Sequence, residues 1–163
     1  MTVLSSAAYI PAMEPPHTIS WGPDRRSVRI IDQRALPERH VHLELRTLDE
    51  ACDAIRTLAV RGAPAIGIAA AMALAVVLDP DADQDHDARS ARARAAAEPL
   101  GSPRPTAVNL AWALDRMLAV AEGPLRGDVW RSALGREATA ILEEDQAMCR
   151  RIGEHALTLF PAD

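Results

Sequence analysis

The segment Ala63–Leu78, APAIGIAAAMALAVVL, constrains the fold more than any other part of this chain. It contains no polar side chain, so a helix formed from it would be apolar on every face. Such a helix must be covered on all sides, and we expect it at the centre of a helical bundle. The segment has about 16 residues and includes Pro64 and Gly67, so it falls short of the roughly 20 residues that a membrane span needs.

The remaining sequence shows no sign of a secretory or membrane segment. A charged start followed by a signal-length apolar run is missing near Met1. The two cysteines, Cys52 and Cys149, form no CxxC pair, and both fall in helical-looking segments. This usage favours buried free thiols. We therefore expect a cytoplasmic protein with no membrane partner.

Three short stretches in the first 45 residues have the pattern of β-strands. They are residues 18–21, 27–32 and 41–45, and Gly22-Pro23-Asp24 supplies a turn between the first two. We expect a small antiparallel sheet of about three strands. Residues 1–17 hold several prolines and little periodicity, which predicts an N-terminal arm.

Helical spacing begins directly after the third stretch. Thr47, with Glu50 three residues later, matches a capping box at a helix N-terminus. Apolar residues at helical spacing follow, and they predict a helix that ends near Arg61 and Gly62. The next helix then begins at Pro64, a residue suited to a first helical turn.

Two further helical patterns follow, at residues 104–122 and from Asp128 towards Leu159, where Gly153 is a point of interruption. The predicted class is α+β: a sheet of about three strands with a helical bundle, leading into a long helix. We expect a domain over residues 18–125 and a linker helix over residues 126–163.

Composition excludes several classes of function. The net charge is −5, from 18 basic and 23 acidic residues, which argues against nucleic acid as the main partner. Every basic residue is arginine. The lack of lysine excludes a Schiff-base lysine and a Walker lysine.

Two junctions share one design. Arg61 and Gly62 precede the helix at Pro64, and Arg104 precedes Pro105 and its helix. A helix N-terminus offers unpaired N–H groups and a partial positive charge, and an arginine fork suits phosphate oxygens. Together the junctions would hold a phosphorylated small molecule. The alternative is that each arginine caps or bridges locally, and that glycine and proline only end and start helices.

Two clusters of potential metal ligands give weaker indications of a functional site. His40 and His42 share a face of the third stretch and could pair on a metal, but no third ligand is near in sequence. Solvent-facing histidines are favoured. The aspartate-rich run around His86 lacks the glycine and glutamate of an EF-hand, which favours a solvated loop leading into a helix. We expect no metal site.

Four motifs occur in the order and rough spacing of one enzyme family. They are IIDQRALP at 30–37, VRGAPAIGIAAA at 60–71, RPTAVNLAWALDRM at 104–117 and IGEHA at 152–156. On these motifs, residues 18–160 resemble the methylthioribose-1-phosphate isomerases of methionine salvage. The resemblance implies an aldose–ketose isomerisation of this small sugar phosphate by a homodimer, with no cofactor. It also implies that Arg61, Gly62, Ala63 and Arg104 bind the substrate.

The same resemblance implies that the catalytic residues lie elsewhere. In the family, a larger Rossmann-like domain follows the N-terminal domain. The catalytic cysteine lies in a Thr-His-Cys-Asn-type motif just beyond the position of Asp163, and the catalytic aspartate comes later. Neither Cys52 nor Cys149 matches that motif. We therefore expect no catalytic residue here, in a chain that is a fragment, a truncated reading frame or one piece of a split protein.

Two other functions remain open on the same fold. One is isomerisation of ribose 1,5-bisphosphate by a related enzyme. The other is noncatalytic: relatives serve as regulatory subunits of the guanine-nucleotide exchange factor for translation initiation.

We expect no turnover of 5-methylthioribose 1-phosphate by these 163 residues alone. Anchoring the phosphate orients the sugar, but moving a proton between adjacent carbons needs a positioned acid/base group. Incubation of the purified chain with the sugar phosphate, followed by NMR, tests this expectation. Ketose formation above an enzyme-free control contradicts it.

Overall fold

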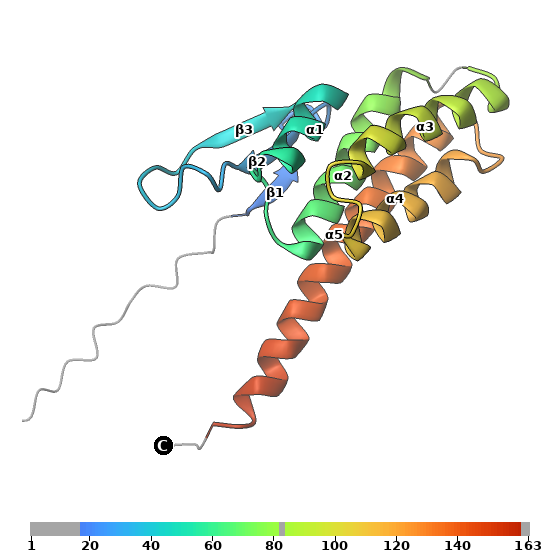
Figure 1. The fold of residues 1–163 in the computed structure, drawn as a ribbon. Coiled ribbons are helices and arrows are strands. Elements are labelled where there is room, and N and C mark those ends of the chain that lie inside the picture. The colour runs from blue at the N-terminus through green and yellow to red at the C-terminus, as the bar shows by residue number, and fades with distance from the viewer. Residues whose placement is uncertain (1–16, 82–83, 161–163) are drawn as a thin grey trace, which may run out of the picture.

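The structure is a computed structural model that describes residues 17–81 and 84–160. The sheet and helix α1 lie on one side of a bundle of longer helices (Figure 1). The elements are β1 (Ile19–Trp21), β2 (Val28–Ile31), β3 (His42–Leu45), α1 (Leu48–Arg56), α2 (Ala63–Leu78), a 3-10 turn η1 (Asp79–Asp81), α3 (His86–Gly101), α4 (Val108–Ala121) and α5 (Gly127–Leu157). The predicted α+β class is confirmed. The expected N-terminal arm lies outside the described residues, apart from His17.

The three strands form an antiparallel sheet in the order β1-β2-β3, as the strand patterns predicted. In the register, Val28 of β2 faces Trp21 of β1 and Leu45 of β3. Val28 and Ile30 are fully buried, whereas Arg29 between them is exposed. This alternation turns one face of the central strand towards the helices.

Helix α2 is the central helix of the bundle. Eleven of its sixteen residues are buried. It contacts α1, α3, α4, α5 and the sheet. Covering by neighbours on several sides is what an all-apolar helix requires, so the prediction for this segment is confirmed. Within the described ranges, no helix is long and apolar enough to cross a membrane.

Helices α2 and α4 approach each other closely in the bundle. A Cβ placed on Gly67 would lie 2.6 Å from the backbone oxygen of Asn109 and 3.3 Å from the Cβ of Ala113. Only glycine permits this contact between backbones. Because Gly67 and Asn109 both lie near the start of their helices, α2 and α4 begin at the same end of the bundle.

Helix α1 ends earlier than its apolar spacing predicted. It stops at Arg56, and Leu58 adopts a left-handed conformation with φ of 61°. Ala59 and Val60 are buried in the turn that follows, not on a helix face. The prediction of a helix reaching Arg61 was wrong because buried turn residues continued its apolar pattern.

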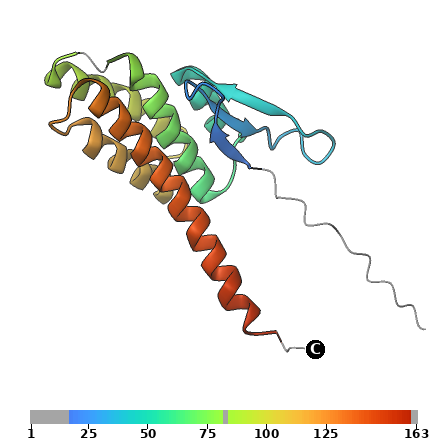
Figure 2. The ribbon, with the colours of Figure 1, turned by 180° about the vertical axis from the view of Figure 1, so that it is seen from behind.

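Helix α5 has two different halves. Trp130, Leu134 and Ile141 of its first half are buried in the bundle. The second half projects beyond the other helices (Figure 2), with Ile152 largely exposed. Two predictions fail here: the helix runs through Gly153 without a break, and the Cys149 thiol is exposed. Cys52 is half-buried, and burial raises the pKa of its thiol.

The contact at Gly67 supports a stability prediction. We expect Gly67→Ala to lower the free energy of unfolding by about 1–3 kcal/mol, because backbone must shift to admit the methyl group. Gly135→Ala is the matched control in α5, where a new Cβ meets nothing within 4 Å. That change should raise stability by up to about 1 kcal/mol through helix propensity. Urea unfolding measures both, and equal effects of the two substitutions would contradict the close approach.

Candidate functional site

The two arginine junctions of the sequence lie at one end of the bundle. Gly62 is the N-cap of α2 and Ala107 the N-cap of α4, and neither helix has a side-chain cap. In contrast, Thr47 caps α1 and Asp85 caps α3. The ends of α2 and α4 therefore keep the partial positive charge that capping side chains would partly offset.

Several amide groups at these ends have no hydrogen-bond partner among the described residues. In the described part of the chain, the N–H groups of Ala63, Ala65, Val108 and Asn109 make no hydrogen bond. The first N–H groups of a helix point outward along its axis, where an anion can accept from them. Gly62 has φ of 102°, a left-handed conformation that favours glycine, and it is exposed.

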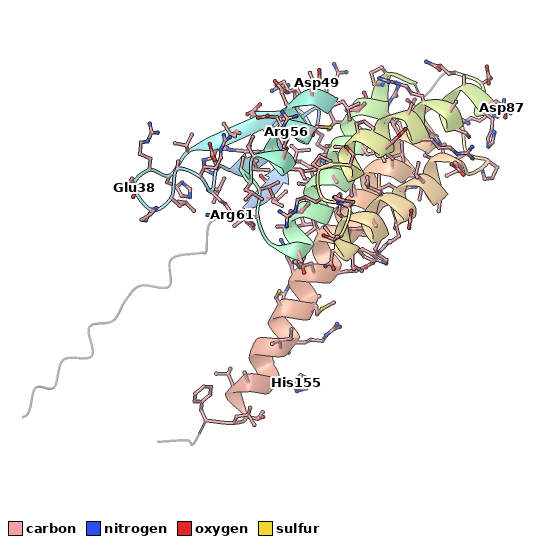
Figure 3. The ribbon with its side chains drawn as sticks, in the orientation of Figure 1. Glu38, Asp49, Arg56, Arg61, Asp87 and His155 are labelled. Carbon is pink, nitrogen blue, oxygen red and sulfur yellow. The ribbon has the colours of Figure 1, made fainter. Side chains whose placement is uncertain are left out.

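Arg61 is held in place without losing its charge. Its Nη2 donates to the carbonyl oxygen of Gln33 at 2.8 Å, and Nε2 of Gln33 donates to the carbonyl oxygen of Arg61 at 3.1 Å. Among the described residues, no carboxylate pairs with this guanidinium. Arg61 lies in the connection between the sheet layer and α2 (Figure 3). The local bridge thus orients the cation and leaves the rest of the fork exposed.

A loop after β2 supports this connection. The Asp32 carboxylate accepts hydrogen bonds of 2.8 Å from both Nε and Nη2 of Arg34, whose Nη1 donates to Oγ1 of Thr57 at 2.9 Å. The amide of Gln33 donates to the carbonyl oxygen of Ala59 at 2.9 Å. Hydrogen bonds from Arg34 hold the pKa of Asp32 below its ordinary value. The loop therefore fastens the turn that carries Arg61 to the sheet.

Arg104 lies in the turn before α4. Its amide donates to the carbonyl oxygen of Gly101, and its own carbonyl oxygen accepts from Ala107 at 3.0 Å. The half-exposed guanidinium makes no hydrogen bond to any described residue. Both predicted arginines therefore flank uncapped helix ends in the same region.

Beside these ends lies a groove that the sequence did not predict. Its volume is about 310 Å³, and it runs between α2, α4 and α5. The apolar side chains that line it are Pro64, Ile68, Val108, Trp112, Ile141 and Met148. The core face of α4 is instead formed by Leu110, Ala113, Leu114 and Met117. The spacing of Val108 and Trp112, offset from that face, is the signal that could have indicated the groove.

Charged residues fix one wall of the groove. Arg116 donates to Glu144 at 2.6 and 3.0 Å and to Glu137 at 2.6 Å, and its Cζ lies 5.0 Å from the ring centroid of Trp112. Hydrogen bonding to Arg116 lowers the pKa of Glu144, and the two carboxylates raise the pKa of Arg116. The indole is thereby stacked against a guanidinium that has two partners.

The contact between His40, which lies just before β3, and His42, the first residue of β3, is local. The rings of His40 and His42 meet edge to face with centroids 4.9 Å apart. Burial lowers the pKa of His42, with smaller effects from Arg29 and His40. Across residues 17–81 and 84–160, no three His, Cys, Asp or Glu side chains are grouped to hold a metal.

Comparison with known proteins identifies the class of this fold. Residues 59–163 match the model of the Initiation factor 2 subunit family, and the chain belongs to this family. In solved structures, it is similar to 5-methylthioribose 1-phosphate isomerase from Pyrococcus horikoshii (34% identity, TM-score 0.71, 80% of this chain and 37% of that one). It is equally similar to the delta subunit of translation initiation factor eIF-2B from A. fulgidus (36% identity, TM-score 0.71, 80% and 38%).

Two curated relatives are more similar in sequence. The methylthioribose-1-phosphate isomerase of Gemmatimonas aurantiaca is 49% identical over 143 residues, which are 88% of this chain and 41% of the relative. The 5-deoxyribose 1-phosphate isomerase of Moorella thermoacetica is 45% identical over 149 residues, 90% and 42% of the two chains. The chain thus spans about two fifths of the length of these relatives.

The Asp32 pair supports a prediction of pH dependence. Because the folded pKa of Asp32 is lowered, its stabilisation is complete above the unfolded pKa and disappears as pH falls through the folded value. We expect Asp32→Asn to lower the free energy of unfolding at pH 7 by about 1–3 kcal/mol. The gap to the unsubstituted chain should narrow below about pH 4.

Unfolding by urea across pH 3–7 measures this gap. Asp115→Asn is the matched control, because Asp115 is exposed on α4 and makes no ion pair with a described residue. It should leave stability unchanged at every pH. A constant gap for Asp32→Asn from pH 7 to pH 3 would show that its carboxylate charge does not matter.

Proposed function

We propose that this chain forms the phosphate- and sugar-binding part of an isomerase that converts 5-methylthioribose 1-phosphate to 5-methylthioribulose 1-phosphate. The observation that carries the proposal is the pair of uncapped helix ends beside Arg61 and Arg104. It occurs in a chain that is 49% identical over 143 residues to a methylthioribose-1-phosphate isomerase.

In this proposal, the substrate phosphate lies at the joint end of α2 and α4. The unpaired amides of Ala63 and Ala65 donate from α2, and Arg61 and Arg104 add charged donors from two sides. Gly62 has no Cβ, so a phosphate oxygen can approach the backbone closely. We assign Arg61, Gly62, Ala63 and Arg104 to substrate binding.

The chemical step makes a different demand. Aldose–ketose isomerisation moves a proton between adjacent carbons, and this needs an acid/base group near the opened sugar. We propose that the catalytic cysteine and aspartate come from the part of the relatives that this chain does not span. Its own residues then bind and orient the sugar phosphate, which lowers the entropic part of the barrier.

The names of the relatives narrow the substrate class. Methylthioribose 1-phosphate carries a methylthio group on carbon 5, and in 5-deoxyribose 1-phosphate carbon 5 is itself a methyl group. Each is therefore a small sugar phosphate with an anionic end and an apolar end. We favour this class over ribose 1,5-bisphosphate, which carries charge at both ends.

We further propose how the chain is organised in the complete enzyme. Residues 18–125 form the substrate-binding domain, and residues 126–163 form a helical link to the remaining part. The enzyme acts in the cytoplasm as a homodimer. The net charge of −5 on these 163 residues favours the small-molecule substrate over nucleic acid as the partner.

Binding by the ¹⁵N-labelled chain tests the anion site. We expect 5-methylthioribose 1-phosphate to shift the amide signals of Gly62 and Ala63 and the Nε–H signals of Arg61 and Arg104. Arg61→Ala and Arg104→Ala should each weaken affinity about ten- to a hundredfold, the usual effect of removing a hydrogen bond to a charged group. Ribose 1,5-bisphosphate should bind more weakly than the methylthio sugar.

Arg126→Ala is the matched control. Arg126 is exposed at the start of α5, at the end of the bundle where α4 terminates, and its loss should leave affinity unchanged. Equal weakening by all three arginine substitutions would indicate a general charge effect. Unchanged affinity in Arg104→Ala would favour the noncatalytic regulatory function.

A further inference from the structure

We propose that the groove between α2, α4 and α5 binds the apolar carbon-5 substituent of the sugar phosphate and discriminates against a hydroxyl there. Its specificity-determining side chains are Ile68, Val108, Trp112 and Met148. This inference rests on the proposed function and deepens it, because it assigns the far end of the substrate to named residues.

The position of the groove matches the two ends of the substrate. Pro64 and Val108 belong to the first turns of α2 and α4, so the groove starts where the proposed phosphate site lies. It then continues one turn along both helices, past Ile68 and Trp112. A sugar held by its phosphate at the helix ends would direct its other end along this path.

The groove exposes apolar surface that the core does not use. Val108 is 78% exposed, Met148 52% and Trp112 47%, although the other face of α4 is fully packed. Burying a methylthio group against these side chains would remove apolar area from water on both sides. The thioether of Met148 and the ring of Trp112 are suited to contact a second sulfur group.

One wall of the groove is already rigid. Arg116 stacks on Trp112 at 5.0 Å and is itself bound by Glu137 and Glu144. A prearranged indole loses little freedom when the ligand arrives, which favours affinity. The carboxylates of Glu144 and Asp145 also border the groove and would repel a second phosphate on carbon 5.

Three ligands on the 163-residue chain test the proposal. They are 5-methylthioribose 1-phosphate, 5-deoxyribose 1-phosphate and ribose 1-phosphate, titrated by NMR. We expect the methylthio sugar to bind at least about tenfold more tightly than ribose 1-phosphate, as apolar pockets allow. Of the three indole N–H signals, that of Trp112 should move, whereas Trp21 and the buried Trp130 serve as internal references.

A double substitution in the groove tests whether its side chains cause the preference for the methylthio sugar. Val108→Thr with Met148→Gln keeps side-chain size at two exposed positions. The double variant should lose most of the tenfold preference, because it weakens binding of the methylthio sugar more than binding of ribose 1-phosphate. Its amide spectrum, compared with that of the unsubstituted chain, shows whether the fold is kept.

The outcomes separate this inference from the proposed function. Binding that depends on Arg104 but shows no carbon-5 preference overturns the groove and leaves the phosphate site standing. A preference that the double variant abolishes, without dependence on Arg104, supports the groove and overturns the proposed phosphate site. If none of the three sugars binds, both are overturned.

Discussion

The candidate site depends on the close packing of α2 against α4. At Gly67 the backbone of α2 lies so near Asn109 that no Cβ fits between them. Because this contact is near both N-termini, two helix ends with unpaired amides lie together. A larger residue would separate the helices at the end where an anion could bind to both.

The loop after β2 holds Arg61 in position without pairing it with a carboxylate. The loop after β2 fastens the turn before α2 through Asp32, Arg34 and Thr57, and Gln33 holds Arg61 through backbone carbonyls. A carboxylate partner would have neutralised the arginine. Here the ion pair of Asp32 and Arg34, the two residues that flank Gln33, supplies the rigidity, and the charge of Arg61 is not neutralised by a described carboxylate.

The apolar residues of helix α4 lie on two faces, one in the core and one at the groove. Leu110, Ala113 and Met117 pack into the core, while Val108 and Trp112 face the groove and remain partly exposed. The long α5 completes the groove with Ile141 and Met148. One end of the bundle thus combines positively charged helix ends with an adjoining apolar surface. These two features would complement a small anion that has an apolar end.

The sequence by itself determined the elements whose signal is local. The alternation of apolar and polar residues predicted the strands. The lack of polar side chains in Ala63–Leu78 predicted a helix at the centre of the bundle. It also indicated Arg61 and Arg104 as candidates, because both precede helix starts. It misplaced the end of α1, since the left-handed Leu58 and the buried turn after it mimic helical spacing. Only the tertiary structure brought the two junctions to one end and formed the groove, because both depend on backbone packing between segments some forty residues apart.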